Sequence, residues 1–260
     1  TGNSSTQTIS GVGFQGDLTW IKARDSTDWH SLVDTVRGYN KYIYPNDTSA
    51  EATSTTRLTS WNSDGFVLGS QDETNTNTTD YVAWNWKAGT TTALSGGTIT
   101  PTSQSVNTTS GISIVTYTGN GSAGATIPHG LGATPQVIIT KNLSDSGTPR
   151  SWAVYQEGAG NTKYMNLNFN SAWATGVNRW NNTSPTSTLF SVGVSPEVNV
   201  SGDLYVAYLF TPIKGYSCLS NWTGAGGTHP FMYCGFEPAF VIAKNMESAK
   251  SWLMYDNKRP

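Results

Sequence analysis

The chain has 260 residues, only 12% of them charged, and a formal net charge of −2. This balance excludes the basic surface that nucleic acid requires, and no apolar run approaches the roughly 18–20 residues of a membrane-spanning helix. The 10 tryptophans, 12 tyrosines and many threonines favour pleated sheet, because these side chains pack well on it.

Short apolar or alternating runs, bounded by Gly, Asn, Asp or Pro, predict strands along the whole chain. The first part supplies residues 17–22, 29–33, 39–44, 65–68 and 81–87. The middle part supplies residues 112–118, 136–141, 152–155, 163–167, 188–192 and 204–210, and the last part residues 216–222, 231–234, 239–244 and 251–255. Because no stretch has a convincing helical pattern, we expect an all-β fold of antiparallel β-sandwiches, jelly-roll or lectin-like in kind.

One ordered pattern occurs three times along the chain. In each copy a Thr-Gly pair is followed by a Gly-apolar pair, a strand that ends in lysine, and a tryptophan. The first glycines are Gly2, Gly119 and Gly224, the lysines are Lys22, Lys141 and Lys244, and the tryptophans are Trp29, Trp152 and Trp252. A period of roughly 100 residues matches a small sandwich domain and is too long for a solenoid repeat.

This period predicts tandem modules. We call residues 1–89 the first repeat, 111–213 the second and 214–260 the third, with a Thr-, Ser- and Gly-rich linker at 90–110. The second and third copies have a predicted strand before their Thr-Gly pair, whereas the first copy has none. We therefore expect the first module to lack its first strand and the third to be incomplete, with the remainder supplied by further chain or by neighbouring chains.

Two pairs of residues predict local contacts. Asp34 and Arg37 recur as Asp256 and Arg259, and we expect each pair to form an ion pair that fixes the turn after the tryptophan strand. The second repeat has Gln156-Glu157-Gly158 in that place, so this role does not extend to it.

Cys218 and Cys234 flank the predicted turn at 223–228. If they lie opposite each other on paired strands, a cross-strand disulfide is feasible. The alternative is a pair of small buried residues, which we favour because neither other repeat has these cysteines. No cysteine spacing typical of a metal site is present.

Several motifs of the repeat carry a resemblance to a known family. They are Tyr-Thr-Gly-Asn-Gly (117–121), Gly-Phe-x-Pro (235–238), Ser-Asp-Gly-Phe (63–66) and Tyr-Val-Ala-Trp (81–84), together with the lysine-ended strand and the tryptophan. This set resembles a repeated β-sandwich module of tail-fibre-like and other virion structural proteins of marine and cyanobacterial phages, and it covers essentially the whole chain. The resemblance implies a fibre, spike or capsid decoration on the virion exterior. Its implied partners are other copies of itself, as in a homotrimer, other virion proteins and glycans of the host surface.

The sequence offers little for catalysis. His30, His129 and His229 lie at non-equivalent positions, and the motifs of nucleophilic, zinc, phosphate and dinucleotide sites are absent. We therefore expect a non-enzymatic structural protein with no cofactor and no metal. The alternatives are a secreted carbohydrate-binding module and a bacterial surface-filament or adhesin subunit that receives a strand from its neighbour.

Tryptophans are the candidates for ligand or subunit contact, since aromatic side chains stack on sugars and are enriched in interfaces. Trp20, Trp29, Trp84 and Trp152 lie in the strand repeats, and we expect them in the core. Trp61, Trp173 and Trp180 lie in loop-like stretches. A lectin predicts these three exposed in a concave site, whereas a fibre predicts them buried between chains.

Overall fold

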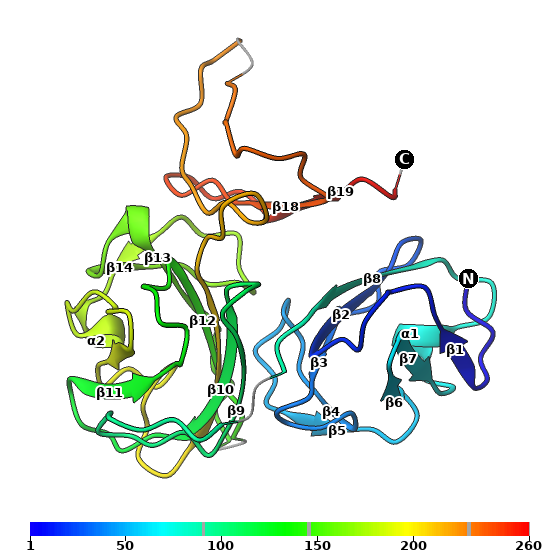
Figure 1. Cartoon of the computed structure of the whole chain (residues 1–260), viewed down its shortest axis with the longest axis horizontal. Helices are drawn as coiled ribbons and strands as arrows, with labels where there is room; N and C mark the ends of the chain where they lie inside the picture. The colour runs from blue at the N-terminus through cyan, green and yellow to red at the C-terminus, as the bar shows by residue number, and fades with distance from the viewer. Residues whose placement is uncertain (90–91, 145–146, 228–229, 260) are drawn as a thin grey trace.

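A computed structural model describes residues 1–89, 92–144, 147–227 and 230–259. The regular secondary structure of the described chain is almost entirely antiparallel β-sheet, which confirms the all-β, sandwich-type fold class (Figure 1). Among the described residues no helix is long and apolar enough to cross a membrane.

The first repeat forms two facing sheets. In one, β2 (Leu18–Ala23) lies between β3 (Ser31–Asp34) and β8 (Tyr81–Trp86), and in the other β7 (Gly65–Leu68) lies between β1 (Gln7–Ile9) and β6 (Leu58–Asn62). The short strands β4 (Lys41–Tyr42) and β5 (Ala52–Thr53) pair beside them, and α1 (Asp72–Asn75) follows β7. The two sheets enclose a small core of Ile21, Val33, Leu58, Phe66 and Leu68.

The second repeat has the same layers with a wider main sheet. That sheet has the order β13-β12-β17-β10-β9. Its strands are β13 (Ala153–Gln156), β12 (Val137–Asn142), β17 (Leu204–Phe210), β10 (Ile112–Thr118) and β9 (Ser103–Asn107). Facing it are the pair β11 (Ala125–Pro128) and β16 (Leu189–Val192), the pair β14 (Lys163–Tyr164) and β15 (Ala174–Thr175), η1 (Glu157–Ala159) and α2 (Val177–Trp180). The larger core between these layers includes Val115, Tyr117, Ile138, Tyr155, Trp180, Phe190 and Tyr205.

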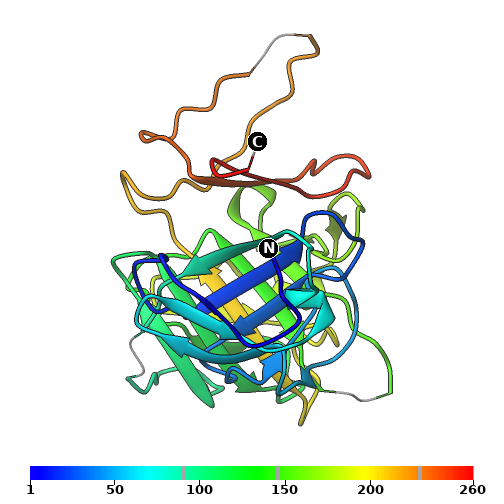
Figure 2. The same cartoon turned by 90° about the vertical axis from the view of Figure 1, so that its right-hand side faces the viewer.

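The third repeat contributes one hairpin, β18 (Phe240–Ala243) with β19 (Leu253–Asp256). The hairpin lies above the two larger bodies (Figures 1 and 2). Phe240 inserts against the first repeat, with its ring centroid 5.5 Å from that of Trp84 and 5.6 Å from that of Trp86. One apolar cluster therefore includes residues of all three repeats, among them Leu18, Trp84, Ile114, Trp152, Tyr208, Phe240 and Met254.

The recurring Thr-Gly-Asn motif is held by a buried asparagine. In the first repeat Asn75 Nδ2 donates to the carbonyls of Ser5 (2.5 Å) and Gly69 (2.7 Å), and it also donates to Asn3 Oδ1. In the second repeat Asn199 Nδ2 makes the same bonds, to the carbonyls of Ser122 and Gly193 (both 2.9 Å) and to Asn120 Oδ1. Buried amides must find such partners, so the motif closes the start of each repeat onto a loop near its end.

This closure also explains why the motif contains glycine. A Cβ added to Gly119 would lie 2.2 Å from the Val200 carbonyl oxygen, and one added to Gly2 would lie 2.2 Å from that of Thr76. Real Cβ atoms do not approach backbone oxygens so closely. In the third repeat a Cβ at Gly224 meets nothing within 4 Å, which agrees with the lack of an asparagine after it.

Most predicted strands are confirmed, with bounds shifted by up to three residues, and two predicted strands are wrong. Residues 216–222 and 231–234 form no strand, because no neighbouring strand pairs with them. The predicted linker 90–110 contains β9, which pairs with β10 along five residues. The sequence predicts edge pairing in this linker near residues 98–100, whereas the strand lies at Ser103–Asn107, where Ser103-Gln104-Ser105 give no apolar alternation.

The motif glycines give a matched stability test. We expect Gly119→Ala to lower the free energy of unfolding by about 1–3 kcal/mol, because the backbone must move away from the new methyl group. We expect Gly224→Ala to change it by less than about 0.5 kcal/mol, as an exposed site should. Urea unfolding of both variants checks this, and equal losses would contradict the closure described above.

Candidate functional site

A buried ion pair lies where the first repeat meets the second. Arg37 Nε is 2.6 Å from Asp34 Oδ2, and the two side chains are 2% and 0% exposed. Asp34 Oδ1 also accepts the Arg37 backbone N–H (2.9 Å), so the carboxylate fixes the turn after β3. Tyr208 of the second repeat donates its hydroxyl to Asp34 Oδ2 at 2.7 Å. The expected ion pair is thus present, and it also joins two repeats.

The third repeat builds the same turn. Arg259 Nε lies 2.5 Å from Asp256 Oδ2, and Asp256 Oδ1 accepts the Arg259 backbone N–H at 3.0 Å. Trp84 of the first repeat donates its indole N–H to Asp256 Oδ2 at 3.2 Å. In each case an aromatic donor from another repeat reaches the carboxylate of the turn.

In a second set of contacts, side chains of one repeat donate hydrogen bonds to backbone carbonyls of the repeat before it. Lys141 and Trp152 of the second repeat donate to the carbonyls of Thr48 (3.2 Å) and Tyr44 (2.9 Å) in the first. Lys244 and Trp252 of the third repeat donate in the same way to the carbonyls of Asn170 (3.3 Å) and Asn166 (3.1 Å) in the second. The lysine and the tryptophan of the sequence pattern are therefore the donors that hold the preceding repeat.

The first repeat carries His30 in the place of these tryptophans. The His30 backbone N–H donates to Asn46 Oδ1, as that of Trp152 donates to Asn168 Oδ1 (both 3.0 Å). His30, and not Trp29, therefore occupies the position of Trp152, one residue away from the position expected from the sequence. Trp29 is 44% exposed, so the expectation that it lies in the core is wrong. Its ring instead lies edge-on to Tyr44, with centroids 4.7 Å apart. Trp20, Trp84 and Trp152 are buried as expected.

His30 is held in its neutral form. Trp20 Nε1 donates to His30 Nδ1 at 2.9 Å, which requires that nitrogen to carry no proton. Burial, with a smaller contribution from the charge of Lys22, lowers the pKa of His30 to about 4.

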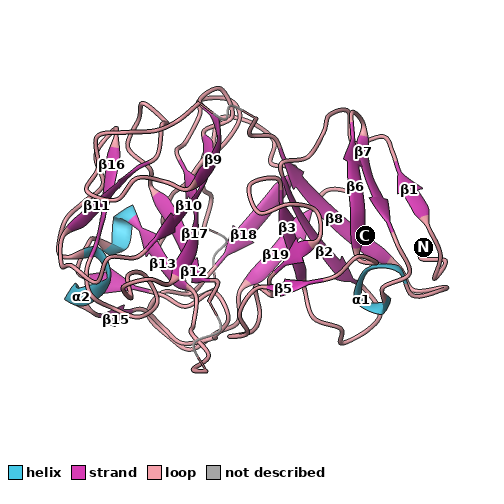
Figure 3. Ribbon diagram, turned by 90° about the horizontal axis from the view of Figure 1, so that it is seen from below, coloured by secondary structure: helices cyan, strands magenta, loops and turns pink. Residues whose placement is uncertain are grey.

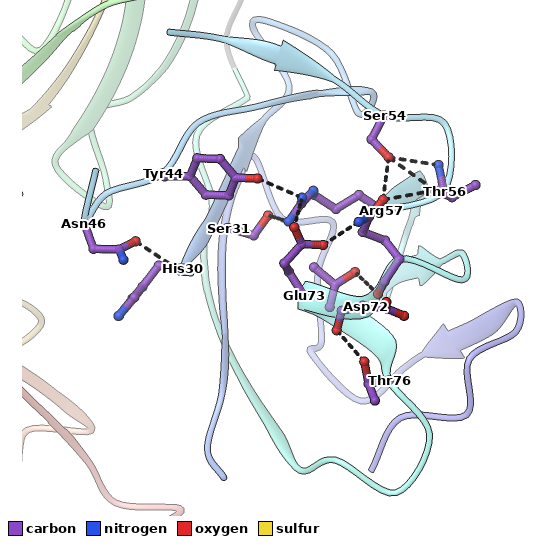
Figure 4. A network of polar contacts seen from close by, with 12 residues as sticks. His30, Ser31, Tyr44, Asn46, Ser54, Thr56, Arg57, Asp72, Glu73 and Thr76 are labelled. Atoms are coloured by element: carbon purple, nitrogen blue, oxygen red, sulfur yellow. Dashed lines mark hydrogen bonds and ion pairs between the residues drawn. The ribbon is translucent and has the colours of Figure 1, made fainter. Parts of the chain in front are cut away.

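The charges beneath the first repeat are also paired within the chain (Figure 4). Arg57, which is 1% exposed, donates to Ser31 Oγ (3.0 Å), and its Nη2 lies 3.3 Å from Glu73 Oε1. Its guanidinium also lies 3.9 Å above the centre of the Tyr42 ring. The second repeat reproduces this arrangement with Arg179, Glu197 and Tyr164. These contacts support the loops of the first two repeats.

A hollow of about 560 Å³ lies where the first repeat meets β9. The most buried charged group that lines it is Asp17. Burial raises the pKa of Asp17, although its hydrogen bonds with Thr35 and Ala88 oppose this change. Both Asp17 oxygens are engaged, one by Thr35 Oγ1 (3.0 Å) and one by the Ala88 N–H (2.8 Å). The Asp17 carboxylate therefore fixes the backbone that follows β8. In the described part of the chain no group of His, Cys, Asp and Glu could hold a metal ion.

Of the three candidate tryptophans, which the sequence places in loop-like stretches, Trp180 lies on α2 and is buried, and Trp61 lies on β6 and is half-buried. Trp180 is 1% exposed, and its indole donates to the Lys163 carbonyl (3.1 Å). Trp61 lies on β6 and packs against the core of the first repeat. Trp173 is half-buried, with Lys163 Nζ 3.7 Å above the centre of its ring. The structure therefore does not bring these three side chains together.

The cysteines form no disulfide. Cys218 and Cys234 are free and half-buried, and neither lies on a strand. The paired strands that a cross-strand disulfide requires are not formed, so the two cysteines do not occupy cross-strand positions.

The contact residues at the joints could be found only in part from the sequence. The regular recurrence of lysine, tryptophan and Asp-x-x-Arg marked one side of each contact. The other side consists largely of backbone carbonyls, such as those of Tyr44 and Asn166, which leave no residue-type signal.

Comparison with known proteins places the chain in a family. The model of the family described as "Domain of unknown function (DUF7483)" matches residues 1–260, so the chain belongs to that family. No curated protein and no solved structure matches the chain.

The two Asp-Arg turns provide a test of the buried contact. We expect Arg37→Ala to lower the free energy of unfolding by about 3–5 kcal/mol, because it leaves the fully buried Asp34 carboxylate without its cation. Arg259→Ala removes a pair whose arginine is 28% exposed, and we expect a loss of about 1 kcal/mol or less. Urea denaturation at pH 7 compares them, and equal losses would show that burial is not what makes the first pair matter.

His30 predicts a pH dependence. Because its pKa is lower in the folded chain than in the unfolded one, the unfolded chain binds the extra proton between pH 6.5 and 4. Stability is therefore lost as the pH falls through this window, by about 2–3 kcal/mol for this group. His30→Gln keeps an acceptor for Trp20 and cannot titrate there. We expect the variant to lose correspondingly less stability between pH 7 and 4.5 in urea unfolding, and parallel losses in both proteins would refute this assignment.

Proposed function

We propose that this member of the family is a non-enzymatic structural protein of a virion. In this role, as a fibre, spike or capsid decoration on the particle exterior, it displays β-sandwich units for assembly and attachment to a host surface. Its partners are other copies of itself, other virion proteins and host glycans. The observation that carries the proposal is the recurrence of the same donors, Lys141 with Trp152 and Lys244 with Trp252, on the carbonyls of the preceding repeat.

A contact that recurs along a chain supports a mechanical role. Each joint combines a buried apolar interior with hydrogen bonds of fixed geometry, so neighbouring repeats cannot swing independently as they would on a flexible linker. A stiff series of units suits a protein that holds contact loops away from a particle. Several such chains on one particle would convert weak contacts into avidity.

The pairing of buried charges also supports this proposal. Asp34, Arg37 and Arg57 all bind partners within the chain, and their geometry accounts for them as structural residues. The low charge content leaves a surface of hydroxyls and amides, which suits a protein that stays outside the cell.

One observation favours the carbohydrate-binding alternative. Trp29 and Trp222 are 44% and 50% exposed, and exposed aromatic rings can stack on sugars. They lie in the first and third repeats respectively, and nothing in the described structure joins them into one concave site. A secreted lectin or a bacterial surface-filament subunit is therefore the second choice.

Labelling of particles tests the proposal. We expect antibodies raised against the 260-residue chain to label the outside of intact, DNA-containing virus particles purified on a density gradient from the source of the sequence. The chain should remain with the particles through that gradient. Antibody label on bacterial cell surfaces, or recovery of the protein only as a free secreted lectin, would overturn the virion assignment.

A further inference from the structure

The three repeats share one position whose side chain bonds to another repeat. Asp34, Gln156 and Asp256 are equivalent, because each pairs with the first residue of β2, β12 or β18, the strands that carry the recurring lysine. Their partners are, in the same order, Tyr208 of the second repeat, Asn221 of the third and Trp84 of the first, at 2.7, 2.8 and 3.2 Å. At this one position the first repeat is therefore joined to the second, the second to the third, and the third to the first.

Two of these joints also share their lysine and tryptophan donors. The donors of the second repeat and those of the third bind carbonyls that are placed alike in the repeat before. In both cases the two carbonyls lie two residues before and two residues after an asparagine, which is Asn46 in the first repeat and Asn168 in the second. Each asparagine accepts a backbone N–H within its own repeat. The second repeat thus sits on the first as the third sits on the second.

The joint between the third repeat and the first uses the part of this interface that surrounds the Asp-Arg turn. Tyr208 and Trp84 are equivalent, because Tyr-Val-Ala precedes each of them. Arg37 donates to the Tyr208 hydroxyl (3.3 Å) as well as to Asp34, and the Arg259 guanidinium lies 5.1 Å from the centre of the Trp84 ring. The interface is head-to-tail and returns to the first repeat after three steps, and a head-to-tail interface that returns in this way forms a ring.

The ring surrounds apolar side chains that come from all three repeats. From below, β18 and β19 lie between the sheet that contains β17 and the sheet that contains β8 (Figure 3). Among the described residues β18 pairs only with β19, and an isolated hairpin is marginally stable at best in water. The hairpin therefore depends for its stability on packing against the other two repeats, and Phe240 makes this contact with Trp84 and Trp86.

We propose that the three repeats close a pseudo-threefold ring within a single chain, in which the surface around Trp84 and Trp86 is the docking site for the hairpin of the third repeat. Each repeat is related to the next by about a third of a turn around the shared apolar interior. A homotrimer builds such a unit from three copies, whereas this chain builds it from three unequal repeats. Contacts between copies on a particle must then use surfaces outside the ring. This inference goes beyond the proposed function and does not rest on it.

Hydrogen exchange of the hairpin tests the docking. Trp84→Phe removes the N–H that Asp256 accepts, so the amides of β18 and β19 should exchange at least about tenfold faster. Trp84→Tyr supplies a hydroxyl donor as Tyr208 does, and its hairpin should exchange like that of the parent. Trp61→Phe is the matched control, because it removes an indole N–H that bonds within the first repeat, and it should leave the hairpin unchanged.

Peptides from β6 and β7 in the same experiment show whether the first repeat stays folded in each variant. Unchanged exchange of the hairpin in Trp84→Phe would overturn the proposal. So would an equal effect of Trp61→Phe, because the hairpin would then respond to any loss of stability in the first repeat.

Phe240→Ala tests the same joint from the other side. It removes the ring that packs against Trp84 and Trp86, so the amides of β8 should exchange at least about tenfold faster. Tyr255 lies on the same hairpin and is 59% exposed, and Tyr255→Ala is therefore the control that should leave β8 unchanged. If β8 exchanges alike in Phe240→Ala and in the parent, the hairpin does not dock there and the proposal fails.

Sedimentation equilibrium tests whether the ring lies within one chain. The 260-residue chain should sediment at its own mass of 27.9 kDa, because all three joints are made inside it. A homotrimer, or any oligomer that Trp84→Phe dissociates, would show that separate copies supply the joints and would overturn the single-chain ring. Particle labelling is unaffected by any of these results, so the virion role can fail or stand separately.

Discussion

The arrangement of the repeats depends on a carboxylate that has been removed completely from water. The Arg37 guanidinium faces this Asp34 carboxylate, and the Tyr208 hydroxyl donates to the same carboxylate oxygen, Oδ2. Burial by itself would lower the pKa of Arg37, but the facing Asp34 carboxylate outweighs this and raises it, so the guanidinium remains charged. Removing either partner from such a pair leaves an uncompensated buried charge, which makes the position of the second repeat on the first specific.

A similar contact joins the third repeat to the first, where Trp84 donates to the carboxylate of Asp256 as Tyr208 donates to that of Asp34. Lysine and tryptophan side chains of the second repeat donate to the first repeat, and those of the third repeat donate to the second. The Asp-Arg turn of the third repeat contacts the first repeat. The three contacts enclose one apolar interior, to which every repeat contributes strands. The position of each repeat on the others therefore follows from these residues.

Sequence patterns were sufficient for most strands of the two main sheets and for contacts close along the chain. The Asp-x-x-Arg turn follows from its short spacing, and strands such as β10 and β17 follow from their apolar runs. Patterns failed where a partner is distant. Nothing near Trp180 in the sequence indicates that a helix of four residues carries it into the core, and nothing near Asp34 indicates Tyr208, which is 174 positions away. The shift from Trp29 to His30 had the same cause, since only the backbone contact to Asn46 distinguishes the two alignments.

A double-mutant cycle between Asp34 and Tyr208 tests the central claim most directly. Asp34→Asn, Tyr208→Phe and the combined variant would be compared with the parent by urea unfolding at pH 7. The account predicts a coupling energy of about 1.5–3 kcal/mol, the range for a buried hydrogen bond to a charged group. Losses that add to within about 0.5 kcal/mol would show that the two side chains act independently, and would contradict the view that this contact joins the repeats.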